Sequence, residues 1–213
     1  MEASAEARPS SRVARRRDRR KAEIVRTATE LLSAQGYQGM SLEDVAERTD
    51  IAKATLYHYF SGKDELVRAV LESLTMDVVM RLETALNEVI GLSYLEQLRA
   101  LIREQVRILT ETAPEVAAVF SWPKSWPESL SGAIKDSRRR HDAIFRSVVE
   151  GGIDAGEFDC PYPDVALQCL HGALNQSSLW IRVSMDRESK ATLREQLVDT
   201  ASLMMGARGC TAN

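Results

Sequence analysis

The sequence has few of the features that define several protein classes. It has three cysteines, Cys160, Cys169 and Cys210, an odd number without C-x-x-C spacing. We therefore expect reduced thiols and neither a disulfide framework nor a zinc knuckle. With 6 prolines and 11 glycines in 213 residues the chain is neither collagen-like nor of low complexity. An apolar content of 44% with 28% charged residues predicts a globular chain of one large or two small domains.

A long hydrophobic run is also missing. The longest uncharged stretch, 165–181, contains polar residues such as Gln168, His171 and Asn175, so we expect no membrane-spanning segment. The basic start of the chain reaches Glu23 before any apolar segment accumulates, unlike a signal peptide. We therefore predict a cytoplasmic protein that has no membrane partner.

Signatures of catalysis are missing as well. The sequence has no G-x-S-x-G, H-E-x-x-H, P-loop or dinucleotide-binding motif. Its three histidines, His58, His141 and His171, lack the spacing of metal ligands. We expect that the protein is not an enzyme and has no catalytic residue, no metal site and no cofactor.

Positive charge is concentrated near the start of the chain. Eight basic residues lie between Arg8 and Lys21 against Asp18 alone, a local charge of +7 in a chain of net charge −3. Such a run is either a solvated, disordered tail or a set of phosphate contacts. We predict a flexible basic arm over residues 1–18, and the segments that follow it decide between the two uses.

The next fifty residues predict a helix-turn-helix. Apolar residues at three- and four-residue spacing (Ile24, Ala28, Leu31 and Leu32) predict a helix over 19–35 that stops at Gly36. A capping box, Ser41-Leu42-Glu43-Asp44, begins a helix over 42–48, and Thr49-Asp50 separates it from a helix over 52–59. We expect Leu56 and Phe60 to anchor that last helix.

The remaining chain also reads as helices. A second capping box, Ser61-Gly62-Lys63-Asp64, begins a long helix towards Ile90. Further helices are predicted over 94–112, 114–121, 128–150, 163–184 and 189–208. No alternating strand pattern is present, so the predicted fold class is all-α. We divide the chain into the arm, a helix-turn-helix domain over 19–65 and a larger helical domain over 66–213.

The motifs of the small domain resemble a known family. Ser41–Ala46, Ala52–Phe60 and Lys63–Leu66 are similar to the DNA-binding domain of the tetracycline-repressor (TetR) family, in which a small-residue turn precedes T-L-Y-x-[HY]-F and K-x-x-L. One departure is Asp50, where the family usually has glycine; aspartate tolerates the left-handed backbone that the turn requires. The resemblance implies a dimeric regulator of transcription that binds DNA and responds to a ligand.

The residues of the predicted recognition helix fit the major groove. Anchored by Leu56 and Phe60, the helix can turn Lys53 towards guanine, and Ala54 and Thr55 towards thymine methyls. The candidate DNA-binding residues are Ser41, Lys53, Ala54, Thr55, Tyr57, Tyr59 and Lys63, together with Arg16, Arg17 and Arg20 on phosphates or in the minor groove. For the two tyrosines, packing within the domain is the alternative interpretation.

Affinity for DNA at cellular salt requires two recognition helices on one frame, so we expect a homodimer. The last two helices carry apolar stripes, consisting of Leu167, Leu170, Leu174 and Ile181 in one and Leu193, Leu197, Ala201, Met204 and Met205 in the other. As in the family, these stripes are predicted to form a four-helix interface. The alternative is that they serve the core of their own subunit.

The larger domain is expected to bind an effector. Its aromatic residues gather near proline breaks where a pocket can open. The candidate ligand-binding residues are Phe120, Trp122, Trp126, His141, Phe145, Asn175, Gln176 and Trp180, each of which can equally serve core packing. Residues 138–145, 150–158 and 180–182 loosely resemble an acyl-CoA-responsive TetR subgroup. This resemblance implies a small apolar effector, such as a fatty acyl-CoA or a related lipid or steroid thioester.

The predicted function is therefore a ligand-responsive dimeric regulator. We expect a repressor that binds a palindromic operator and is released by its effector. A non-sensing architectural DNA-binding protein, with the same arm and helices but without sequence preference, is the alternative.

Overall fold

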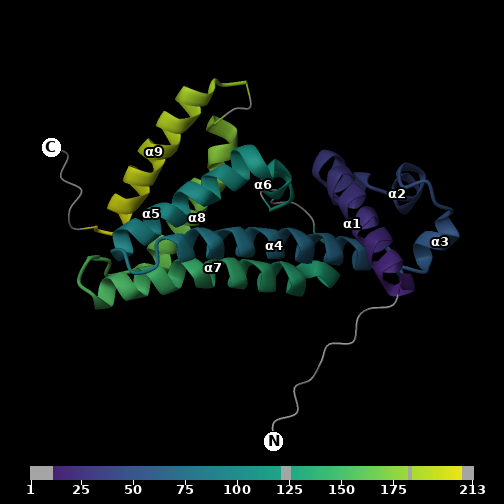
Figure 1. The fold of residues 1–213 in the computed structure, drawn as a ribbon, viewed down its shortest axis with the longest axis horizontal. Helices are drawn as coiled ribbons and strands as arrows, with labels where there is room; N and C mark the ends of the chain where they lie inside the picture. The colour runs from purple at the N-terminus through teal and green to yellow at the C-terminus, as the bar shows by residue number, and fades with distance from the viewer. Residues whose placement is uncertain (1–11, 121–125, 182–183, 208–213) are drawn as a thin grey trace, which may run out of the picture. The chain divides into compact units, whose positions relative to one another are not determined.

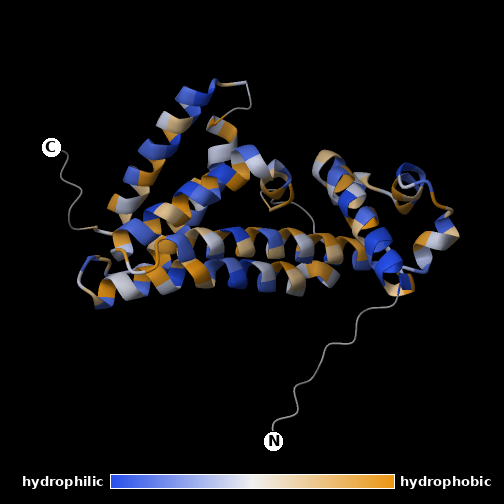
Figure 2. Cartoon of the chain, in the orientation of Figure 1, coloured by the Kyte–Doolittle hydropathy of each residue, from blue (hydrophilic) through white to orange (hydrophobic). Residues whose placement is uncertain are grey.

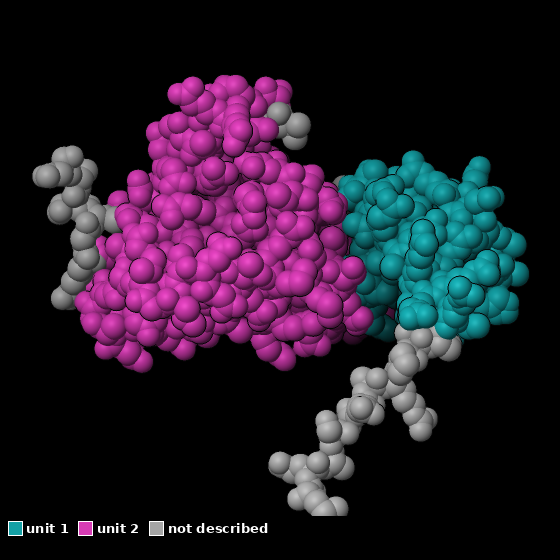
Figure 3. Space-filling view, in the orientation of Figure 1, with its two compact units in different colours: residues 1–70 teal, residues 71–213 magenta. Residues whose placement is uncertain are grey.

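The computed structural model describes residues 12–120, 126–181 and 184–207. The chain divides into two compact units, residues 1–70 and 71–213 (Figure 3), so the boundary falls after residue 70 rather than at 65. Apart from one isolated bridge between Phe158 and Ala207, every described regular element is a helix, which confirms the all-α fold class. No helix in these ranges is long and apolar enough to cross a membrane.

The first unit is built from helices α1 (Arg12–Gly39), α2 (Leu42–Arg48), α3 (Lys53–Tyr57) and the start of α4 (Lys63–Glu88) (Figure 1). The predicted apolar side of α1 is buried at Ile24, Ala28, Leu31 and Leu32. Leu56 and Phe60 are also buried, which confirms that they anchor α3. Helix α1 has a break at Gly36, whose φ of 70° favours glycine.

Local sequence signals set the ends of α2. Ser41 Oγ accepts a hydrogen bond from the Asp44 amide at 3.1 Å, and Asp44 accepts one from the Ser41 amide, which confirms the capping box. After α2, Asp50 has a φ of 51°, the left-handed conformation that we expected aspartate to tolerate in this turn. The cap sets the start of α2, and the turn at Asp50 separates α2 from α3.

The second capping box has a different partner from the one predicted. The backbone amide and hydroxyl of Ser61 both donate to Glu65 Oε2 at 2.6 Å, while Asp64 accepts a hydrogen bond from the Tyr37 hydroxyl. Asp64 is thereby used to join the start of α4 to the end of α1. The carboxylate that bonds to Ser61 is therefore that of Glu65, one residue later than predicted.

Part of the predicted flexible arm is helical. Helix α1 begins at Arg12, so residues 12–18 continue the helix that we expected to start at Arg19; residues 1–11 lie outside the described part. Arginine is a good helix former, and the nearest proline is Pro9, so no residue in 12–18 interrupts the helix. Hydrophilic residues dominate the first turns of α1 in Figure 2. Most of the basic residues are therefore held on a helix.

The second unit is arranged around α5 (Tyr94–Arg107), which packs against α7, α8 and α9. Its described elements, besides α4, are a π-helical turn η1 (Ile108–Thr112), α6 (Pro114–Phe120), a 3₁₀ turn η2 (Glu128–Leu130), α7 (Ser131–Asp154), α8 (Pro163–Trp180) and α9 (Arg187–Met204). Leu98, Leu101 and Ile102 bury one side of α5 completely. An ion pair between Arg103 and Glu195, at 2.8 Å, joins α5 to α9.

The stripes predicted as a dimer interface lie mostly inside the subunit. The stripe residues of α8 with Ile181 just after it, and Leu197, Ala201 and Met205 in and just after α9, are at most 8% exposed. Leu193 is partly buried and Met204 is 38% exposed. The prediction that these stripes meet a partner was wrong for the buried residues. Apolar periodicity shows that a helix face is buried, but it does not distinguish the subunit's own core from a partner.

Candidate nucleic-acid interface and ligand pocket

Helix α3 has one buried and one exposed side. Leu56 is fully buried, whereas Lys53 and Ala54 are exposed and Tyr57 is 47% exposed. The Lys53 ammonium pairs with the Glu43 carboxylate of α2, and this hydrogen bond holds the pKa of Lys53 above its ordinary value. Lys53 therefore remains a cation at the exposed side of α3. On this side, the small side chain of Ala54 allows close approach to a major groove, and the long side chains of Lys53 and Tyr57 can reach base edges.

The other predicted contacts around α3 are less exposed. Thr55 and Tyr59 are partly buried, and Ser41, also partly buried, serves as the cap of α2. Lys63 is partly buried with its ammonium 4.4 Å from the centre of the Tyr37 ring, a cation–π contact. Lys63 thus has a stabilising role within the unit, and its contact with phosphate stays a prediction.

The three predicted arginines differ in their surroundings. Arg16 and Arg17 are exposed. Arg17 lines the same surface hollow as Lys21 and Tyr59, so these three residues can contact the same stretch of the DNA phosphate backbone. Arg20 instead donates to Glu23 Oε2 at 2.8 Å and to the Thr49 carbonyl at 3.4 Å. Arg20 therefore holds the end of α2 against α1.

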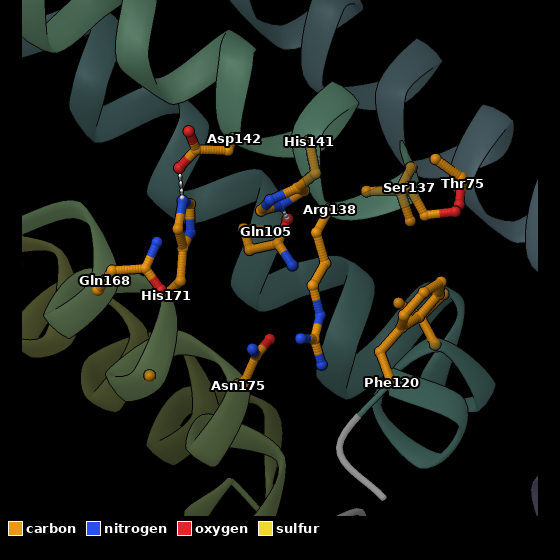
Figure 4. A pocket seen from close by; sticks show the side chains of 13 residues that line it. Thr75, Gln105, Phe120, Ser137, Arg138, His141, Asp142, Gln168, His171 and Asn175 are labelled. Carbon is orange, nitrogen blue, oxygen red and sulfur yellow. Dashed lines mark hydrogen bonds and ion pairs between the residues drawn. The ribbon is translucent and has the colours of Figure 1, made fainter. Parts of the chain in front are cut away.

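A cavity of about 310 Å³ lies in the second unit (Figure 4). Helices α4 to α8 line it with Thr75, Val78, Gln105, Val116, Phe120, Ser137, Arg138, His141, Asp142, Gln168, His171, Gly172 and Asn175. Most of these residues are polar. The sequence predicted mainly aromatic lining residues with sparse polar contacts from His141, Asn175 and Gln176, so the observed lining has more polar residues than expected.

Three of the eight predicted ligand-binding residues line this cavity: Phe120, His141 and Asn175. Phe145 is fully buried and supports the two histidines, with its ring centre 5.3 Å from that of His141 and 5.1 Å from that of His171. Gln176 and Trp180 are exposed on α8, and Trp126 is partly buried; none of the three lines the cavity. Trp122 lies outside the described residues.

The two histidines of the cavity are held by hydrogen bonds. Nε2 of His141 lies 2.9 Å from Gln105 Oε1, and Nε2 of His171 lies 3.2 Å from Asp142 Oδ1. Burial lowers the pKa of His141 to about 3 and also lowers the pKa of His171. Both rings are therefore neutral at pH 7. Asp142 also accepts a hydrogen bond from Arg146 Nε at 3.1 Å, and the same guanidinium pairs with Asp164 at 2.7 Å.

The sequence reasoning missed several polar lining residues. A usable signal was present, because Arg138, His141 and Asp142 follow i, i+3, i+4 spacing on α7. Gln168, His171 and Asn175 of α8 have i, i+3, i+7 spacing, which also places them on one face of a helix. Among the described residues no group of three or more histidine, cysteine or carboxylate side chains could hold a metal ion.

Comparison with known proteins identifies the family to which the chain belongs. Residues 24–70 match the family described as bacterial regulatory proteins, tetR family. Residues 91–204, more than half of the chain, match the family described as tetracyclin repressor-like, C-terminal domain. The chain is also 24% identical to the HTH-type transcriptional repressor KstR2 of Mycobacterium tuberculosis, over 87% of this chain and 90% of that protein.

Solved structures share the fold. FadR from Bacillus subtilis in complex with stearoyl-CoA is 19% identical with a TM-score of 0.72, covering 85% of this chain and 97% of that one. AibR in complex with isovaleryl coenzyme A and operator DNA is 21% identical with a TM-score of 0.69, covering 89% and 100%. These likenesses show a shared fold, and the family follows from the two family matches. The chain belongs to the TetR family of DNA-binding transcriptional regulators, which are not enzymes.

Proposed function

We propose that the protein is a dimeric repressor that binds a palindromic operator through two copies of α3 and is released by a small-molecule effector. The observation that supports this most strongly is the two-sided character of α3, with Leu56 buried and Lys53, Ala54 and Tyr57 exposed. Exposed Arg16 and Arg17 on α1 supply charge for phosphate contacts that strengthen binding without reading sequence.

The dimer is proposed to form through the outer faces of α8 and α9. Because most of the predicted stripe residues are buried in the subunit, a partner must meet other apolar side chains of these helices. Val165, Leu179 and Trp180 of α8 are 62%, 66% and 52% exposed, and Leu203 of α9 is 56% exposed. Exposed apolar groups of this size on neighbouring helices favour association.

The effector is proposed to bind in the cavity of the second unit. A fatty acyl-CoA or a related lipid or steroid thioester is the first class to test, because FadR and AibR are seen with stearoyl-CoA and isovaleryl coenzyme A. Thr75 and Val78 of α4 line the cavity, and the same helix begins at Lys63 in the DNA-binding unit. An effector that prefers one arrangement of the dimer would shift the population away from the DNA-binding arrangement.

The test is selection of an operator from random duplexes, followed by titration with wild-type protein, Lys53→Ala and Lys135→Ala. Lys135 is an exposed lysine of α7 and serves as the matched control. We expect Lys53→Ala to weaken operator binding about 5- to 150-fold and to relax preference at one base pair, because a base contact is lost. Lys135→Ala should bind as wild type. Selection that enriches no sequence would contradict the proposal and favour the architectural alternative.

A further inference from the structure

The cavity of the second unit combines three polar features that favour a particular ligand chemistry. Among the residues that the structure describes, these are a guanidinium without a carboxylate partner, a buried imidazole acceptor without a donor, and a buried hydroxyl without a hydrogen-bond partner. Each belongs to a residue of α7 or α8 that lines a cavity of about 310 Å³, a volume at the small end of ligand pockets. The inference below rests on the proposed role of this cavity as the effector site.

The guanidinium is that of Arg138. Figure 4 shows its side chain extending from α7 into the cavity, into the same space as Asn175 and Phe120. No carboxylate partner for it occurs among the residues that the structure describes. The charged residues that line the cavity are Arg138 and Asp142, and Asp142 is already bonded to Arg146 and His171. Arg138 is therefore the lining cation that has no carboxylate partner among the described residues. An arginine fork matches a carboxylate by two parallel hydrogen bonds.

The two arginines that follow Arg138 show that the position of Arg138 at the cavity is specific to that residue. Arg138, Arg139 and Arg140 are all exposed, but of the three only Arg138 lines the cavity. Arg139 pairs instead with Asp136 at 3.4 Å. Of these three arginines, Arg138 is therefore positioned to contact a ligand. Arg140 serves as a matched control.

The imidazole acceptor is Nδ1 of His171. Its Nε2 faces Asp142, and an ionised carboxylate only accepts, so Nε2 carries the proton and Nδ1 of the neutral ring holds a lone pair. Nδ1 is buried and has no hydrogen-bond partner within the described part of the molecule. A ligand that donates a hydrogen bond here removes the cost of this unsatisfied acceptor.

The buried hydroxyl is that of Ser137. The residue is 3% exposed, its Oγ has no partner among the described residues, and it lies near Thr75 in Figure 4. Val78, Val116 and Phe120 supply the apolar part of the wall. The lining therefore combines a cation, an acceptor and a hydroxyl with a surface that is mostly apolar.

From this arrangement we propose that the cavity binds a small organic acid that also carries a hydroxyl group. Arg138 holds the carboxylate, Nδ1 of His171 accepts the hydrogen bond of the ligand's hydroxyl, and the hydrocarbon body lies against Val78, Val116 and Phe120. Ser137 offers a further hydrogen bond to either polar group. The ligand class is thus more polar and smaller than a long-chain acyl thioester.

The proposal is tested by calorimetric titration of the full-length protein with four sets of probes. The first consists of six- to ten-carbon carboxylic acids, aromatic and aliphatic, that carry one hydroxyl; the second and third are the same acids without the hydroxyl and their neutral amides. Stearoyl-CoA is the fourth. We expect a hydroxy acid to bind, and its deoxy and amide analogues to bind more weakly.

Two variants assign the binding to the cavity. Arg138→Gln should weaken binding of the hydroxy acid about 10- to 100-fold, because a charge-assisted hydrogen bond is lost, while Arg140→Gln should bind as wild type. The proposal is overturned if no acid binds, if amides bind as tightly as acids, or if Arg138→Gln and Arg140→Gln have equal effects.

Titration of the operator on the same samples separates this inference from the proposed function. If stearoyl-CoA releases the operator and no acid binds, the ligand class proposed here is wrong and effector-controlled repression stands. If an acid binds through Arg138 but leaves operator affinity unchanged, the ligand class is supported and the release mechanism is wrong.

Discussion

Replacement of His141 by glutamine should make the second unit less sensitive to acid. In the folded protein burial lowers the pKa of His141 to about 3, whereas an unfolded chain has a histidine pKa of about 6.5. Between these values the unfolded state binds more protons than the folded state, so the free energy of unfolding falls as the pH falls. For one histidine with these pKa values the loss between pH 7 and pH 5 is about 2 kcal/mol.

This loss can be measured by urea unfolding at pH 7 and pH 5 at one protein concentration. All three tryptophans, Trp122, Trp126 and Trp180, lie in residues 71–213, so their fluorescence reports on the second unit. In His141→Gln the difference between the two pH values should be smaller than in wild type by about 2 kcal/mol. The control His58→Gln changes an exposed histidine of the first unit and should behave as wild type. An unchanged pH difference in His141→Gln would refute the account of a histidine that desolvation keeps neutral.

Three further substitutions test local features of the fold by denaturant unfolding. Tyr37→Phe removes the hydrogen bond to Asp64 and should lower the free energy of unfolding by about 1 kcal/mol; no loss would mean that this bond is not formed in solution. Asp50→Ala should destabilise by about 1 kcal/mol, because the backbone there has a φ of 51°, whereas Asp50→Gly should not; equal stability of the two variants would argue against the left-handed turn. Gly152→Ala places a methyl group 2.3 Å from the Phe158 ring and should cost about 1–3 kcal/mol through overpacking; a neutral result would show that the ring moves freely.

Features encoded by neighbouring residues were predictable from the sequence. The bounds of α2 agree with the structure because Ser41 and Asp44 form a cap within one turn, and Asp50 supplies the turn that follows. The buried side of α1 was identified for a similar reason, since apolar spacing along one helix reports directly on burial.

Features that depend on distant contacts were not predictable in this way. Asp64 bonds to Tyr37, 27 residues earlier, rather than to its neighbour Ser61. The stripe on α8 is buried against the subunit's own helices, and its periodicity alone contains no information about which surface covers it. In both cases the outcome depends on tertiary packing.

The ligand site shows the same limit. The sequence indicated residue types that often line pockets, but helix orientation decides which of them face the cavity. His141 and Asn175 do so, whereas Trp180 on the same helix as Asn175 is 52% exposed. Arg138 and His171 could be predicted as lining residues only from the polar spacing along α7 and α8, because aromatic residues give no information about them.

The most direct test of DNA recognition by a symmetric pair of α3 helices is a hydroxyl-radical footprint on the selected operator. Two recognition helices in successive major grooves should protect two equivalent patches on one face of the duplex, with centres about 34–36 Å apart or a multiple of that distance. A single protected patch, or uniform protection along the duplex, would contradict the account.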